Sequence, residues 1–277
     1  VKFDPSLEMR NAVPLPKATL RTFHLEVLPA DGAAAVVGLP ERAPDDEALL
    51  LLADPYSFPT DGFVQQAAAA LPGLPVVGGL AHGAAGPGSS RLWVDGRTVG
   101  RGAVGVVLSG TGAQAALSQG CRSVGPVMTV TEADDNVVVG LAGVPALDKV
   151  REVLADLTPP DQALASQGLQ LGVAADESED EPEFLARPVI GSDRHKGGLV
   201  LADRVRVGQT VRLQVRDADA ADLDLKDTLG RLPVSLGGGA LLFSCRSRGA
   251  GLFGPSYGGV SHDPVVVRAG LGADAVG

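Results

Sequence analysis

A cysteine and two arginines stand close together in the glycine-rich stretch 239-GALLFSCRSRGAGLFGPSYGG-259. Guanidinium groups beside glycine amides suit a carboxylate or a phosphate, because both kinds of group donate hydrogen bonds to oxygen. We therefore expect this stretch to form half of a pocket for a small anionic ligand, and the simpler alternative is a charged surface loop. The predicted contact residues are Ser244, Cys245, Arg246, Arg248 and Gly249.

A second glycine-rich loop, 76-VVGGLAHGAAGPG-88, begins in an apolar run. Glycine permits positive φ and lets backbone amides approach a ligand closely, so we expect this loop to complete the pocket. It lacks the G-x-G-x-x-G pattern that opens a long helix, and no G-x-x-x-x-G-K-[ST] motif occurs in the chain, so no nucleotide cofactor is indicated. The predicted contacts are Gly78, Gly79, His82 and Gly83, and His82 is alternatively an ordinary loop histidine.

The thiol of Cys245 has two interpretations. It is a small buried residue at the end of the apolar run 240-ALLF-243, or it is a thiolate stabilised by the neighbouring arginines. A nucleophilic enzyme also needs a base and an orienting acid, and no spacing ties a histidine to this cysteine. We therefore assign no catalytic residue. The absence of H-x-x-x-H and C-x-x-C spacings likewise predicts no metal site.

The elements that must position these loops alternate only in part between strands and helices. The run 48-ALLLLAD-54 is typical of a strand buried on both faces, and Asp95-Gly96 between apolar segments predicts a tight hairpin over 91–99. The predicted class is therefore α+β, with two tandem hairpin-rich mixed sheets flanked by helices. A pseudo-duplication of layers would account for the presence of two such sheets. Helices are expected over 62–71, 145–157, 218–232 and 263–271, and strands over 34–39, 76–80, 102–110, 125–131, 136–143, 184–191, 198–203, 210–217 and 240–245.

Composition bounds the class of protein. The 277 residues carry a net charge of −10 and show no dense run of Lys and Arg, so a nucleic-acid partner is not indicated. Two distant cysteines form no disulfide framework, and the apolar run 48-ALLLLA-53 is too short for insertion into a membrane. The N-terminus lacks a signal-peptide pattern, so we expect a cytoplasmic protein. The bias toward Ala, Gly, Val, Arg and Asp is typical of a GC-rich bacterial genome.

Three divisions of the chain follow from these patterns. Residues 1–33, with several prolines and no sustained period, are expected to form an extended arm. The segments 34–175 and 184–277 are expected to be the two domains. The acidic run 176-DESEDEPE-183 between them is either a solvated surface loop or the boundary itself.

Four stretches in their order resemble the FIST family, with its N-terminal domain over 34–175 and its C-terminal domain over 184–277. The resemblance implies an intracellular sensory or signal-transduction module that binds small ligands, with amino acids as a favoured class. It supplies no catalytic residues, and no F-box is present. Family members continue beyond the last of these motifs, so the C-terminal domain is expected to be incomplete. The stretches are 76-VVGGLAHGAAGPG-88, 120-GCRSVGPVMTVTEADDNVVVGLAGVPAL-147, 187-RPVIGSDRHKGGLVLADRVRVGQTVRLQVRDA-218 and 241-LLFSCRSRGAGLFG-254.

The residues and the resemblance together predict a cytoplasmic, non-catalytic module that binds an amino acid or another small carboxylate. Two alternatives stay open. One is a scaffold for protein–protein interaction with a signalling partner, and the other is a thiol-dependent enzyme that uses Cys245.

Overall fold

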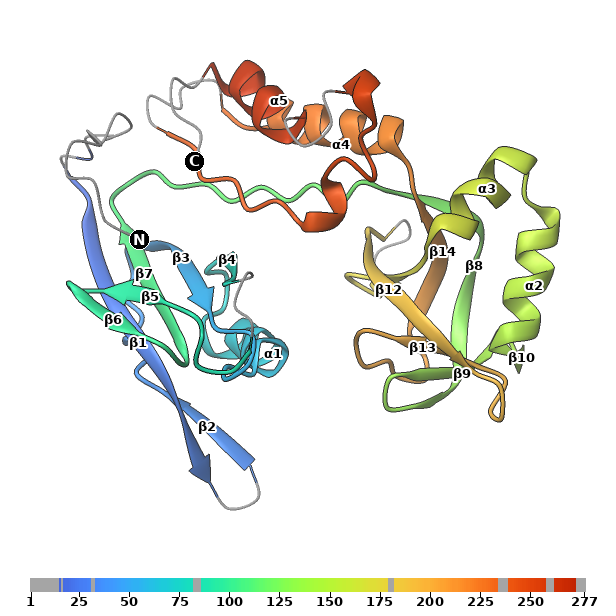
Figure 1. Ribbon diagram of the computed structural model, residues 1–277, viewed down its shortest axis with the longest axis horizontal. Helices are drawn as coiled ribbons and strands as arrows, with labels where there is room; N and C mark the ends of the chain where they lie inside the picture. The colour runs from blue at the N-terminus through green and yellow to red at the C-terminus, as the bar shows by residue number, and fades with distance from the viewer. Residues whose placement is uncertain are drawn as a thin grey trace. The chain divides into compact units, whose positions relative to one another are not determined.

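The computed structural model describes residues 15, 17–30, 33–81, 86–178, 182–233, 239–257 and 262–272. The chain forms two compact units (Figure 1). The first contains the described residues up to Ala116 and again those of 239–243, and the second contains the remainder. None of the described helices is both long and apolar enough to cross a membrane.

The first unit is built on a five-stranded mixed sheet with the strand order β2-β1-β7-β3-β4. Strands β3 and β4 are parallel and joined through helix α1, and the other neighbours are antiparallel. Phe63 and Ala67 of α1 pack against Leu49 and Leu51 of β3 to form the core of this unit. The elements are β1 (Thr19–Ala30), β2 (Ala33–Val37), β3 (Asp46–Ala53), α1 (Thr60–Ala70), β4 (Val76–Leu80), β5 (Leu92–Val94), β6 (Arg97–Val99) and β7 (Ala103–Ser109).

The hairpin predicted from Asp95-Gly96 is confirmed, since β5 and β6 pair on either side of these two residues. Asp95 and Gly96 have φ values of +49° and +72°, and positive φ at both central residues matches the right-handed twist of the strands. The predicted arm over 1–33 differs from the structure, because Thr19–Ala30 forms β1 and pairs with β2 and β7. Phe23 and Leu25 point into the core between exposed or half-buried polar neighbours, a period of two that defines a strand.

The second unit contains a closed antiparallel barrel. Its sheet has the order β10-β9-β13-β12-β11-β14-β8, and β8 also pairs with β9, so six of the described strands form a ring. Helices α2 and α3 lie on one side of this ring (Figure 1). The elements are β8 (Cys121–Asp134), β9 (Val137–Leu141), β10 (Val144–Pro145), α2 (Ala146–Asp156), α3 (Pro159–Gln167), β11 (Leu169–Ala174), β12 (Phe184–Asp193), β13 (Gly198–Leu201), β14 (Thr210–Arg216), α4 (Ala218–Gly230), the short 3₁₀ helices η1 (Arg246–Arg248) and η2 (Pro255–Tyr257), and α5 (His262–Leu271).

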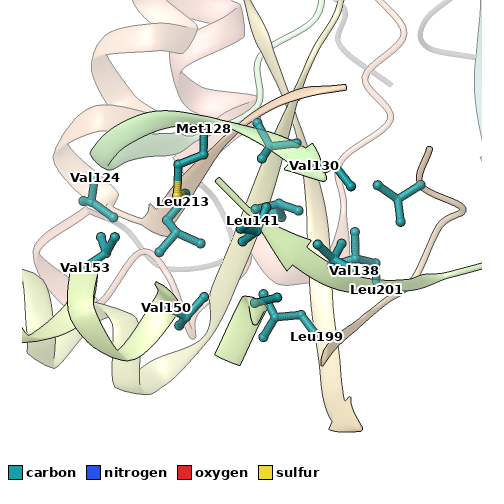
Figure 2. Close-up of a cluster of buried hydrophobic side chains, with 14 of the residues drawn as sticks. Val124, Met128, Val130, Val138, Leu141, Val150, Val153, Leu199, Leu201 and Leu213 are labelled. Carbon is teal, nitrogen blue, oxygen red and sulfur yellow. The ribbon is translucent and has the colours of Figure 1, made fainter. Parts of the chain in front are cut away.

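Alternation along β14 shows how the barrel is filled. Val211, Leu213 and Val215 are fully buried in the core, whereas Arg212 and Gln214 face outward between them. Figure 2 shows Leu213 beside valines of β8 and α2, so the helix closes the core that the strands begin. The outward row of β14 is the row that lines the candidate site described below.

The predicted α+β class, with several sheets flanked by helices, is confirmed. The two halves have separate sheets of different topology, one mixed and one antiparallel. The predicted division at the acidic run differs from the structural one, because that run connects β11 to β12, which pair directly with each other. The residues of this run that the structure describes are exposed or half-buried, as their charge requires, and the strands on either side belong to one sheet.

The strand expected over 240–245 is wrong for the described chain, in which only Ala240 makes an isolated bridge. Leu241 is 63% exposed and Phe243 is 43% exposed, so the apolar run is not a buried strand, and Cys245 at its end is exposed too. The ring of Phe243 lies instead beside Gly79 of β4. Helix α3 and strand β11 had no counterpart among the predicted elements.

A core substitution tests the barrel. We expect Leu213→Ala to lower the free energy of unfolding by about 2–5 kcal/mol, since Leu213 is fully buried and the change leaves a cavity. Urea denaturation of this variant and of Leu223→Ala gives the comparison. Leu223 is 59% exposed on α4, so its loss should change the free energy by at most about 0.5 kcal/mol. Equal losses in the two variants would contradict the core assignment.

Candidate ligand-binding site

The two glycine-rich loops that were predicted to share one pocket begin in different units. Gly78 and Gly79 lie on β4 of the first unit, whereas 244–249 belongs to the second. His82 and Gly83 lie outside the described residues. A single pocket that joins both loops therefore stays a prediction.

Strand packing explains the glycine at position 78. Its φ is +152°, and a β-carbon there would stand 1.8 Å from the carbonyl oxygen of Leu51 on the neighbouring β3. No other residue fits such a close approach of two backbones.

Arg248 forms a buried ion pair. Its Nε and Nη2 donate to the two carboxylate oxygens of Asp263 at 2.8 and 3.1 Å, and the side chains are 9% and 5% exposed. The hydroxyl of Ser244 donates to the same carboxylate at 2.9 Å. Burial raises the pKa of Asp263, but the hydrogen bonds from Arg248, His262 and Ser244 outweigh it and hold this pKa below its ordinary value. Two predicted ligand contacts thus serve an internal carboxylate.

His262 extends this network to helix α4. Its Nδ1 lies 2.9 Å from Asp263 and its Nε2 lies 3.0 Å from Asp222, so both ring nitrogens face carboxylates. Phe253 stacks on the imidazole with ring centroids 3.7 Å apart, and the guanidinium of Arg248 lies 5.4 Å from the centre of the same phenyl ring. The network therefore fastens α5 and the segment 244–254 to α4.

Cys245 is exposed, and its Sγ lies 2.9 Å from the hydroxyl of Ser247. Partial burial raises the pKa of this thiol, but hydrogen bonds from Ser247 and the positive charges of Arg216 and Arg248 outweigh burial, so the pKa lies below its ordinary value. The hydrogen bond to Ser247 is the one that its side chain makes to the described residues, and no histidine among them serves as its base. Arg246 lies in η1.

A polar pocket of about 670 Å³ opens on the outer face of the barrel. It lies wholly in the second unit, where the start of β8 and the outward row of β14 meet the chain that enters β12. Its volume is in the range of small-molecule sites. The lining residues are Gln119, Gly120, Cys121, Ser123, Val127, Pro182, Glu183, Phe184, Arg212, Gln214 and Asp224.

Gln119 organises one end of this pocket. Its Oε1 accepts from the backbone N–H of Ala186 at 2.9 Å, and its Nε2 donates to Glu183 Oε1 and to the carbonyl of Phe184, both at 3.2 Å. The backbone N–H of Gln119 donates to Asp224 Oδ2 at 3.0 Å. Gln119 thus binds two carboxylates, one through its backbone and one through its side chain, and neither forms an ion pair with a described residue.

Arg212 supplies the opposite charge. Its Nε donates to the carbonyl of Gly125 at 2.8 Å, which fixes the guanidinium, and its two terminal nitrogens have no hydrogen-bond partner among the described residues. Gln214 lies between the two charged regions, opposite Ser123 in the register of β14 and β8. The pocket therefore offers a fixed cation, two carboxylates and an amide.

Two side chains at or behind the pocket lining carry a buried polar atom without a partner. In the described part of the chain, three buried side-chain atoms have no hydrogen-bond partner: Ser118 Oγ, Gln214 Oε1 and Arg248 Nη1. Gln214 lines the pocket, and Arg248 Nη1 packs against Gly120 of its wall, where a β-carbon would stand 2.3 Å away. Buried polar groups without partners are rare and costly, so the unsatisfied Oε1 of Gln214 supports this pocket as the candidate site.

Cys121 places the second thiol of the chain in the pocket lining. Burial raises its pKa above the ordinary value; Arg216 and Arg248 oppose this effect, and Asp224 adds to it. A thiol with a raised pKa is a poor nucleophile at neutral pH, so Cys121 acts here as a neutral wall residue.

The sequence analysis did not predict the pocket residues. A polar residue that alternates with buried valines and leucines, as Arg212 and Gln214 do in 210-TVRLQVRD-217, is ordinary for any half-exposed strand. The available signal was Gly120-Cys121, which opens one of the four FIST-like stretches. Its partners lie far away in the chain, so spacing alone could not join them. Among the described residues, no group of His, Cys, Asp and Glu could hold a metal ion.

Comparison with known proteins identifies the family. The chain matches the FIST N domain over residues 10–144 and the FIST C domain over residues 146–263, and it belongs to the FIST family. FIST domains are associated with sensory functions in signal transduction. The change from one domain to the other falls between β9 and α2, inside the second structural unit.

Related proteins occur in mycobacteria. An uncharacterized protein of Mycobacterium tuberculosis is 38% identical over 257 residues, which cover 91% of this chain and 66% of the relative. An uncharacterized protein of Mycobacterium bovis is 37% identical with the same coverage. The chain thus spans about two thirds of the length of these relatives. No solved structure matches it significantly.

Gly120 offers a direct test of the pocket wall. Its φ is +72°, and a β-carbon would also press on Ala221 at 2.8 Å. Gly143 is the matched control, because its φ is +83° but nothing lies within 4 Å of the added carbon. We expect Gly143→Ala to lower the free energy of unfolding by about 1–2 kcal/mol because of backbone strain, and Gly120→Ala to lower it clearly more. Urea denaturation measures both, and equal losses would mean that the contact with Arg248 is loose.

The buried network predicts a pH dependence. The pKa of Asp263 is lower in the folded chain than its ordinary value of 3.8, so the folded chain binds fewer protons than the unfolded one. This stabilisation is complete above that value and is lost as the pH falls through the folded-state pKa. At pH 7, Asp263→Asn should lower the free energy of unfolding by about 3–5 kcal/mol, since it leaves Arg248 buried without a counter-ion. Below pH 5, the free energy of unfolding of this variant should depend less on pH than that of the unchanged chain.

The control for this experiment is Asp227→Asn. Asp227 is exposed on α4 and has no ion pair among the described residues. Its curve of unfolding free energy against pH, measured by urea denaturation from pH 3 to 7, should run parallel to that of the unchanged chain. A parallel curve for Asp263→Asn as well would show that the buried carboxylate does not contribute to acid sensitivity.

Proposed function

We propose that this chain is a cytoplasmic, non-catalytic sensory module, and that it binds an amino acid or another small carboxylate in the pocket of the second unit. Binding would be passed to a signalling partner, in keeping with the association of FIST domains with signal transduction. The pocket residues Gln119, Arg212 and Gln214 would make the main contacts.

The unsatisfied Oε1 of the lining residue Gln214 carries this proposal. A buried acceptor such as Gln214 Oε1 costs free energy unless a partner satisfies it, and a polar ligand in the pocket would supply that partner. The pocket is also preorganised, since the side chains of Gln119 and Arg212 are each fixed by hydrogen bonds to the backbone. Groups that are already fixed lose little conformational entropy on binding.

The charges support the proposed ligand class. A guanidinium with two terminal nitrogens available suits a carboxylate, because it can donate two parallel hydrogen bonds. The carboxylates of Glu183 and Asp224 suit an ammonium group in the same way. A ligand with both groups therefore complements the pocket better than a ligand with one.

A thiol-dependent activity is the second candidate function. The lowered pKa of Cys245 and its exposure favour reactivity of this thiol. Its rate of alkylation against pH would show a midpoint below that of free cysteine. Turnover of a substrate that disappears in Cys245→Ser would replace the sensory proposal by this one.

The binding proposal is tested by a screen of amino acids and small carboxylates with a melting-temperature readout. One class should raise the melting temperature with concentration, as linkage requires. Arg212→Gln should weaken its binding by at least about tenfold, because the charge-assisted contact is lost. Arg206→Gln removes the same charge from an exposed position outside the pocket and should bind as the unchanged chain does.

Protection of Cys121 locates the bound ligand. In a Cys245→Ser background the pocket thiol is the one cysteine left to react, and a ligand in the pocket should slow its alkylation. A melting-temperature increase without this protection would place the ligand elsewhere, and the proposed site would be wrong.

A further inference from the structure

The charges that line the pocket are separated along the strands. Arg212 lies opposite Val127 in the register of β14 and β8, whereas Cys121 lies opposite Arg216. The carboxylates of Glu183 and Asp224 are both bound by Gln119, two residues before Cys121. Asp224 therefore belongs to the Cys121 end of the lining. Glu183 is separated from Arg212 across the sheet instead, because Ala186 of β12 pairs with Gly172 of β11, which pairs with Arg212, and two strand spacings of about 5 Å each separate β12 from β14.

Strand geometry sets the scale of this separation. From the level of Arg212 to the level of Arg216 the strand advances four residues, which is about 13 Å at the usual rise per residue. The hydrogen bond from Arg212 Nε to the carbonyl of Gly125 holds the guanidinium near β8. Arg212 forms no ion pair with Glu183 or Asp224, so its guanidinium stays separate from both carboxylates.

The lining also contains more acceptors than donors. The carbonyl of Phe184 can only accept, so the amide of Gln214 turns its Nε2 toward it and leaves Oε1 as an acceptor. Among the lining residues two carboxylates stand against one guanidinium, and Arg216, opposite Cys121, adds a positive charge near the Asp224 end without lining the pocket. Such a lining attracts ligands with several N–H donors and repels those with a second carboxylate.

We propose that the ligand is an elongated amino carboxylate, with its carboxylate on Arg212 and a primary ammonium, several carbon atoms away, between Glu183 and Asp224. This class includes ω-amino acids and the basic amino acids. The inference rests on the proposed function, because it specifies the ligand of the same pocket. Gln214 and Ser123 line the stretch between the two ends, and Val127 and Phe184 pack against the alkyl chain.

A compact zwitterion meets this arrangement poorly. In an amino acid with a neutral side chain the ammonium and the carboxylate are attached to the same carbon. Such a ligand can place its carboxylate on Arg212 or its ammonium at Glu183 and Asp224, but not both at once. A dicarboxylate would place its second acid group against Glu183 and Asp224, and like charges in contact oppose binding.

Two isomers separate these cases. 6-Aminohexanoate and norleucine have the same atoms and the same net charge, and they differ in the distance between ammonium and carboxylate. Isothermal titration of the whole chain should give a dissociation constant for 6-aminohexanoate at least about tenfold below that for norleucine, with lysine also binding. Hexanoate, which lacks the ammonium, should bind as weakly as norleucine.

Variants assign the ammonium end. Asp224→Asn and Glu183→Gln are exposed changes that keep shape and remove one charge each, and each should weaken 6-aminohexanoate by about tenfold while leaving hexanoate unchanged. Asp227→Asn, one turn further along α4 and outside the pocket, should have no effect.

The outcomes separate this inference from the proposed function. If norleucine or hexanoate binds with Arg212 dependence and 6-aminohexanoate does not, the pocket binds ligands but the elongated class is wrong. Tight binding of 6-aminohexanoate that is insensitive to Glu183→Gln and Asp224→Asn would overturn the assigned ammonium end. If none of these compounds nor any member of the wider screen binds the folded chain, the proposed function itself fails.

Discussion

The carboxylate of Asp263 is an anion buried beneath the surface of the second unit, and such a group must be fully hydrogen-bonded to persist there. Arg248, Ser244 and His262 meet this requirement together. Their positions are therefore not independent: satisfying one carboxylate fixes η1, the start of α5 and the stacking of Phe253. Removing Asp263 would leave the guanidinium of Arg248 buried without a counter-ion, which costs more free energy than the ion pair contributes.

The same guanidinium connects this network to the candidate site. Arg248 gives two nitrogens to Asp263 and packs its third against Gly120, so the pocket wall and the FIST-like segment 244–254 share one side chain. Arg248, one of the two arginines that were expected to contact the ligand, stands behind the wall, and Arg212 is the lining residue with free donors. Residues that support a site and residues that contact a ligand carry the same chemistry, and the fold decides between them.

Local patterns predicted local structure well. Asp95-Gly96 indicated its hairpin and the spacing of 145–157 indicated α2, because turn conformation and helical faces depend on near neighbours in the chain. Strand β1 was not predicted although its apolar and polar residues alternate, because the prolines before it indicated an extended arm. The pocket could not be predicted, because Gln119, Glu183 and Gln214 meet only through pairings between strands far apart in the sequence.

The closed ring in the second unit also decides where the chain is exposed to self-association. The pairing of β8 with β9 closes the ring, so the barrel presents almost no free backbone edge among the described strands. The sheet of the first unit ends at β2, whose sequence Ala33–Val37 contains no charge or proline, and whose outer edge pairs with no described strand. Uncharged, unpaired edges are where strands of different molecules join. Among the described strands, self-association is thus expected at the two outer strands of this sheet, β2 and β4, neither of which contains a charged residue or a proline.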